Sequence, residues 1–123
     1  MSKHKRPPLV NLKVLHQLED EFGDPGPAHT FVQDFVDFWD ERYLRLVEAV
    51  RSRDTNATHE AIRSVRISSS MVGASRLAEL AGDLESNLKR GNLDAVAHAL
   101  PQVKDCGAAT ITKLTTKYIN SEW

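Results

Sequence analysis

Residues Thr58 to Glu85 read THEAIRSVRISSSMVGASRLAELAGDLE and predict two helices joined by a tight turn. At 3.6 residues per turn, the first part of this segment has one small, apolar face and one polar, basic face. The apolar face carries Ala61, Ile62, Val65, Ser68, Ser69 and Val72, and the polar face carries Asn56, His59, Arg63, Arg66 and Ser70. Gly73 can adopt a positive φ and ends the first helix, and leucines recur at helical spacing after it. We therefore expect a helical hairpin.

The same segment resembles the histidine-containing phosphotransfer (HPt) domain. The signature of that family is Ala-His-x-Leu-Lys-Gly-Ser-Ser, three residues, Gly-Ala, and then, a few residues later, Leu-Ala-x-Leu-x-x-x-Leu-Glu. When Gly73-Ala74 is aligned with the Gly-Ala of the signature, the rest of the signature aligns with this sequence without a gap. The aligned positions are Ile62, Arg63, Ser64, Val65, Arg66, Ile67, Ser68 and Ser69, followed by Leu77, Ala78, Leu80, Leu84 and Glu85. The resemblance covers nearly everything from Val10 onward and implies a helical bundle that acts in a phosphorelay.

Two positions depart from the signature, and both matter for chemistry. Arg63 stands where the phosphoacceptor histidine is expected, and Ile67 replaces the glycine that leaves room for a receiver domain in the family. A histidine offers an unprotonated ring nitrogen near neutral pH, whereas an arginine guanidinium stays protonated and has no lone pair to attack phosphorus. Arg66 takes the place of the family's cation that helps hold the phosphoryl group. The resemblance thus implies a retained scaffold and a lost phosphoacceptor.

Apolar residues at helical spacing continue through the rest of the chain and define its other helices. The expected elements are a helix of about ten residues capped by Asn11 and ended by Gly23, a long helix from about Pro27 to Arg53 preceded by Asp24-Pro25, a helix capped by Asp54, the helix after Gly73, and a last helix capped by Asn92 after Gly91. Together they predict an all-α fold, an up-down antiparallel four-helix bundle with a short additional N-terminal helix.

Three residues affect the details of this predicted bundle. Pro101 lacks a backbone donor and clashes with the preceding turn, so the last helix is expected to kink near His98 or to break into two pieces. Phe31 and Phe38 lie beside the core stripe of the long helix and widen its apolar face. We expect both phenylalanines to pack at the edge of the core instead of forming an exposed docking edge.

Length and composition bound the class of protein. With 123 residues, 41% of them hydrophobic and 27% charged, the chain can bury one core, so we expect a single domain over residues 10–123 after a flexible basic tail over residues 1–9. The formal net charge of −1 gives no general attraction to nucleic acid or anionic membrane. No signal peptide or membrane span is apparent, and the lone Cys106 fits a reducing compartment, so a cytoplasmic monomer is expected.

Other candidate residues for chemistry are few. His59 lies one turn before Arg63 on the same face and is the alternative phosphoacceptor, although this shift moves its ring about 6 Å along the helix axis. In-line phosphoryl transfer tolerates little misplacement. His16 has a spacing from Glu19 and Asp20 that could touch a metal, but such pairs on amphipathic helices are usually solvated surface. The sequence contains no catalytic triad, zinc motif or phosphate-cradling glycine loop, so we expect no enzyme activity, metal or cofactor.

The hypothesis that follows is a pseudo-HPt protein, which binds a receiver domain of a response regulator or hybrid histidine kinase without carrying phosphate itself. Its expected binding residues are His59, Arg63, Arg66, Ile67 and Ser70. Two alternatives stay open. One is an active phosphotransfer protein that uses His59 as a relocated acceptor, and the other is a helical adaptor with no link to a phosphorelay.

Overall fold

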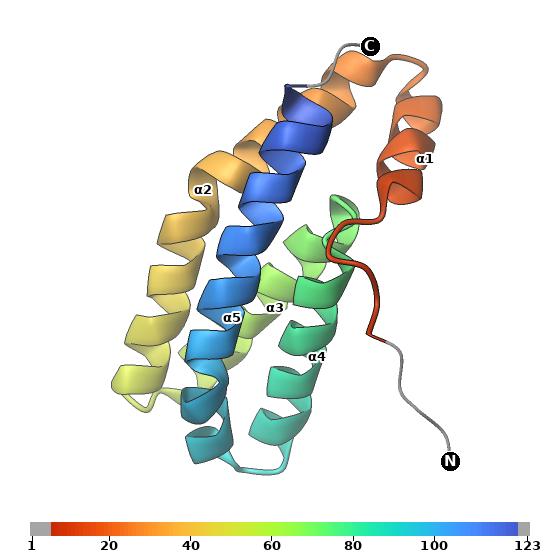
Figure 1. The fold of residues 1–123 in the computed structure, drawn as a ribbon. Coiled ribbons are helices and arrows are strands. Elements are labelled where there is room, and N and C mark those ends of the chain that lie inside the picture. Colours follow the sequence, from red (N-terminus) through yellow and green to blue (C-terminus); the bar gives the residue numbers. More distant parts are fainter. Residues whose placement is uncertain (1–5, 121–123) are drawn as a thin grey trace, which may run out of the picture.

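Every regular element of the computed structural model, which describes residues 6–120, is a helix (Figure 1). The helices are α1 (Leu12–Phe22), α2 (Pro25–Arg51), α3 (Thr55–Met71), α4 (Ser75–Lys89) and α5 (Leu93–Leu114), followed by one π-helical turn, η1 (Thr115–Ile119). Helices α2 to α5 run alternately up and down, and the shorter α1 packs against α2 at one end of the bundle (Figure 1). The predicted four-helix bundle with a short leading helix is confirmed.

The starts of four helices are fixed by side chains that satisfy backbone N–H groups left free in the first turn. The capping contacts are Asn11 Oδ1 to Lys13 N at 3.1 Å, Asp24 Oδ1 to Gly26 N at 3.1 Å, Asp54 Oδ1 to Ala57 N at 3.0 Å, and Asn92 Oδ1 to Ala95 N at 3.0 Å. The second helix therefore begins at Pro25, two residues before the expected Pro27, because the Asp24 cap holds.

Gly73 forms the turn between α3 and α4 with a φ of 74°. A Cβ at this position would lie 2.5 Å from the backbone oxygen of Asn11, and the Asn11 N–H donates a hydrogen bond to the Gly73 carbonyl at 2.7 Å. Glycine is needed here both for the left-handed backbone and for the close approach of the segment that leads into α1. The turn at Gly73 was predicted from the sequence, whereas the close contact between Gly73 and Asn11 was not.

The segment before α1 contacts the bundle along α4. The carbonyl oxygens of Pro7 and Pro8 accept hydrogen bonds from Arg76, one from the side-chain Nε and one from the backbone N–H, both at 3.2 Å. Residues 1–5, which belong to the tail predicted from the sequence, lie outside the described residues.

The core fills the space between α2, α3, α4 and α5, and α1 covers one end of it. Its largest fully buried aliphatic side chains are Leu15, Leu46, Ile62, Leu77, Leu84 and Leu114. Val65 and Ser69 of α3 are buried as predicted, and the small Ser69 lets α3 approach its neighbours closely. Between α2 and α5, the Trp39 indole packs directly over Gly107.

Helix α5 continues through Pro101 as one element, so the alternative of two helical pieces is wrong. Pro101 cannot donate to the carbonyl of Ala97, but both residues are exposed, which lets water satisfy that carbonyl at little cost. The π-helical turn after Leu114 was not expected from the sequence. None of the helices in residues 6–120 is both long and apolar enough to span a bilayer.

Candidate functional site

The five residues predicted to form a binding surface all lie on α3, on the side that faces away from the core. Arg63, Ile67 and Ser70 are exposed, whereas His59 and Arg66 are only partly exposed. The sequence predicts an exposed Arg66, and its side chain is 38% exposed. Its neighbour Val65 is buried, which fixes the rotation of α3 and turns Arg63 outward.

Glu85 of α4 lies beside both partly exposed residues of this surface, His59 and Arg66. Its Oε2 is 3.6 Å from His59 Nε2, and its Oε1 is 3.3 Å from Arg66 Nε. The Arg66 contact is an ion pair by distance only, because Nε is buried and its N–H makes no hydrogen bond. The Glu85 side chain is 18% exposed, so its charge is less screened by solvent than that of a surface carboxylate. Glu85 thus holds Arg66 against α4.

Arg63 differs from Arg66 in having no partner in the described part of the chain. It forms no hydrogen bond or ion pair with any residue between 6 and 120. The guanidinium is therefore an exposed positive charge on α3 that no described residue pairs. It has donors to offer an acidic partner but no nucleophilic nitrogen.

His59, the alternative phosphoacceptor considered from the sequence, faces an acidic side chain. Its Nε2 faces Glu85 at 3.6 Å, so an anionic phosphoryl group approaching that nitrogen would meet a carboxylate. The ring also lies one turn from the Arg63 position, about 6 Å along the axis. Both features disfavour His59 as the nucleophile of an in-line phosphoryl transfer.

Exposed apolar side chains accompany the charged residues. Ile67 is 42% exposed, Met71 40%, Phe31 36% and Phe38 50%. The expectation that Phe38 packs at the edge of the core is wrong, because half of its side chain is exposed, and Phe31 lines a pocket. Arg42 Nε donates to Ser64 Oγ at 3.2 Å across the α2–α3 contact. Phe31, Met71 and Arg42 line one pocket between α2 and α3.

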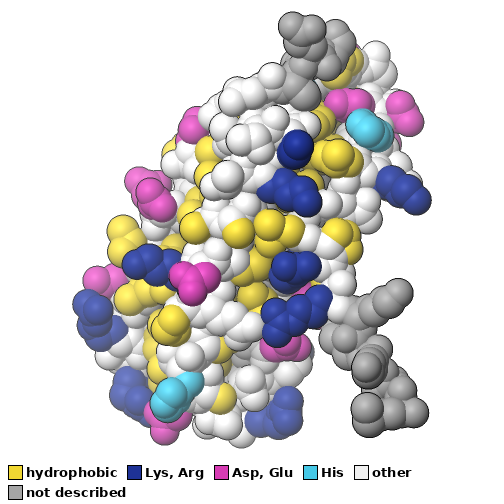
Figure 2. Space-filling model, in the orientation of Figure 1, with side chains coloured by type: hydrophobic (Ala, Val, Ile, Leu, Met, Phe, Trp, Pro, Cys, Tyr) yellow, Lys and Arg dark blue, Asp and Glu magenta, His cyan; other side chains and the backbone are white. Residues whose placement is uncertain are grey.

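The α5 face of the molecule has a different character (Figure 2). Basic and acidic side chains are interspersed there with apolar ones, and no large area of a single charge forms on the face shown. Among residues 6–120, no group of three or more His, Cys, Asp or Glu side chains converges to hold a metal ion. Cys106 is partly buried, and burial raises the pKa of its thiol.

Comparison with known proteins agrees with this geometry. The family model described as Hpt domain matches residues 30–112. Among solved structures, the chain is similar to histidine-containing phosphotransfer protein B (HptB) from Pseudomonas aeruginosa PAO1, with a TM-score of 0.82 and 23% sequence identity over 94% of this chain and 98% of that one. No curated protein sequence matches the chain. The family match spans all of α3 and α4 and most of α2 and α5, and the chain therefore belongs to the Hpt domain family of phosphorelay signalling proteins.

Proposed function

We propose that this protein is a pseudo-Hpt, a member of the family that binds a receiver domain or a histidine kinase without carrying phosphate. The observation that carries the proposal is the state of Arg63. The family signature aligns Arg63 with the phosphoacceptor histidine, and in the structure Arg63 is exposed and has no partner among residues 6–120. An active phosphotransfer protein needs an unprotonated nitrogen at that place, and an arginine does not supply one.

The proposed binding surface consists of His59, Arg63, Arg66, Ile67 and Ser70. Receiver domains present an acidic pocket surrounded by apolar contacts, and this surface offers the complementary charge and apolar area. Glu85 pairs with Arg66, whereas no residue among 6–120 pairs with Arg63, so Arg63 offers the unpaired positive charge of this surface. Arg63 thus supplies orientation and charge matching, and Ile67 supplies apolar contact area.

Binding of this kind would regulate a phosphorelay by occupancy. A receiver held on α3 of this protein is not available to a phosphotransfer partner, and no phosphoryl group leaves it by this route. The protein then acts as a competitor or scaffold instead of a carrier. The relocated acceptor His59 has less support because its Nε2 faces Glu85.

We expect the substitution Arg63→Glu to weaken binding to a cognate receiver about tenfold at low salt, because it places a negative charge against an acidic pocket. Arg66→Glu should have a smaller effect, since Arg66 is already paired with Glu85. The difference should shrink as salt is raised, because screening weakens both attraction and repulsion. Isothermal titration against receiver domains from the same genome measures these dissociation constants.

The matched control is Lys104→Glu, the same reversal of charge at an exposed site on α5. It should leave the dissociation constant unchanged. If Arg63→Glu and Lys104→Glu behave alike, receivers do not dock over Arg63.

A further inference from the structure

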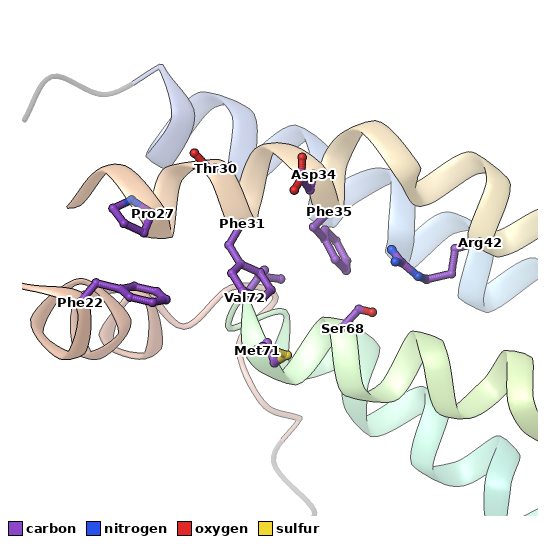
Figure 3. Close-up of a pocket in the computed structure, with 10 residues that line it drawn as sticks. All are labelled: Phe22, Pro27, Thr30, Phe31, Asp34, Phe35, Arg42, Ser68, Met71 and Val72. Carbon is purple, nitrogen blue, oxygen red and sulfur yellow. The ribbon is translucent and has the colours of Figure 1, made fainter. Parts of the chain in front are cut away.

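A pocket opens at one end of the α2–α3 contact, beside the binding surface. Its volume is about 340 Å³, within the range of roughly 300–1,000 Å³ that is usual for small-molecule sites. Figure 3 shows its apolar walls, in which the Phe31 and Phe35 rings extend from α2 toward α3 and Phe22 faces them from α1. Met71 and Val72 close it from the end of α3. The lining is mainly hydrocarbon, contributed by three helices.

One cation, Arg42, stands at the far end of this apolar pocket. Its side chain extends along the α2–α3 contact toward Phe35 and Ser68 (Figure 3). The guanidinium is held in place by the hydrogen bond from Nε to Ser64 Oγ at 3.2 Å. Nη1 is buried and has no hydrogen-bond partner. Ser64 thus fixes the position of the guanidinium but cannot neutralise its charge.

No carboxylate compensates Arg42 within residues 6–120. Asp34, the one acidic residue that lines the pocket, is exposed and forms no ion pair with it. Burial, reinforced by the nearby positive charge of Arg45, lowers the pKa of Arg42, which shows that its surroundings disfavour a lone positive charge. An anion that reaches the guanidinium from the pocket would therefore gain more than it would from a solvated surface arginine.

We propose that this pocket binds a small amphipathic carboxylate, with the carboxylate on the Arg42 guanidinium and the hydrocarbon part among Phe22, Phe31 and Met71. The apolar walls select an aliphatic or aromatic body, and the single uncompensated cation selects an anionic head. The inference is independent of receiver binding, because it depends only on the pocket and on Arg42.

The probe that tests this site is octanoate, compared with octanol and octylamine, which have the same chain with a neutral or a positive head. Titrations followed by ¹H–¹⁵N correlation NMR should show saturable binding of octanoate, with the largest shifts at Phe31, Phe35, Arg42 and Met71. Octanol should bind about tenfold or more weakly, and octylamine should not bind measurably. This comparison needs no variant, so it does not depend on how the protein tolerates mutation.

Variants of Arg42 and Arg45 then test which cation binds the carboxylate. Arg42→Gln should reduce octanoate affinity to that of octanol, Arg42→Lys should retain part of the preference, and Arg45→Gln, which removes a neighbouring cation outside the pocket lining, should retain nearly all of it. Equal affinity for octanoate and octanol in the unmodified protein would overturn the proposal, and so would octanoate shifts centred away from the pocket. Receiver binding by the same samples is measured separately, so the octanoate proposal and the receiver proposal can fail independently.

Discussion

The double substitution Arg63→His with Ile67→Gly is expected to convert this protein into a phosphoacceptor. The first change supplies a neutral ring nitrogen at the exposed position of Arg63, and the second removes the exposed side chain one turn away on the same face. Transfer from a phosphorylated receiver needs both, because the aspartyl phosphate must come into line with the nitrogen. We expect Arg63→His alone to accept phosphate about a hundredfold more slowly than the double variant, the loss typical of small misplacement in such reactions.

A small phosphoryl donor tests for the nucleophilic nitrogen without requiring that a receiver dock. Phosphoramidate reaches an exposed imidazole without any docked protein, so Arg63→His and the double variant should accept its phosphoryl group at similar rates. Intact-protein mass measures both reactions. The glycine costs about 1 kcal/mol of helix stability, which thermal unfolding will show. If the single variant accepts phosphate from a receiver as fast as the double variant, Ile67 does not obstruct docking and this part of the account is wrong.

The substitution Gly107→Ala is expected to destabilise the bundle, although alanine is a better helix former than glycine. Its Cβ would collide with the Cζ2 and Cε2 atoms of Trp39 and would lie 2.8 Å from Nε1. Trp39 is 5% exposed, so its ring has little room to move away. Overpacking of this kind costs about 1–3 kcal/mol or more, which exceeds the gain of about 1 kcal/mol from replacing a helical glycine by alanine.

Gly82→Ala is the matched control for this prediction. Gly82 also lies within a helix, and a Cβ there would meet no atom within 4 Å. Alanine at 82 should therefore raise the free energy of unfolding by up to about 1 kcal/mol, while alanine at 107 lowers it. Urea unfolding followed by circular dichroism measures both. Stabilisation by Gly107→Ala would mean that Trp39 does not pack over this glycine as described.

Much of the fold could be predicted because local signals agree with one another. Asn11, Asp24, Asp54 and Asn92 each precede a run of apolar residues at helical spacing, and each caps a helix in the structure. Pro101 misled the prediction in one respect, because its effect depends on whether the freed carbonyl can reach solvent. That depends on the exposure of Ala97, which is a tertiary property.

The arrangement of the candidate residues on one face of α3 was predictable, but their contacts were not. The spacing of residues on α3 indicates which side chains share a face, and Arg63 and Ile67 are exposed on that face. The role of Glu85 was missed because it depends on how α4 crosses α3. The alignment with the family signature included Glu85 only as the last residue of the signature. In the structure its carboxylate faces both His59 and Arg66.

The pocket is a second feature that sequence reasoning missed. It depends on the approach of α1 to the end of α3, where Phe22 comes to face Phe31. The signal that could have indicated it is the excess width of the apolar face of α2. Phe31 and Phe38 were correctly recognised as lying beside the core stripe, but the prediction that they pack was wrong for Phe38.

The most direct test of the pseudo-Hpt proposal is whether the unmodified protein takes phosphate from a receiver domain that it binds. The receiver should be phosphorylated, mixed with the protein, and followed by both complex formation and intact-protein mass, with His59→Ala in parallel. We predict a stable complex, no gain of a phosphoryl group by the protein, and no difference between the unmodified protein and His59→Ala. A phosphorylated unmodified protein, with the modification abolished by His59→Ala, would contradict the proposal and identify His59 as the acceptor.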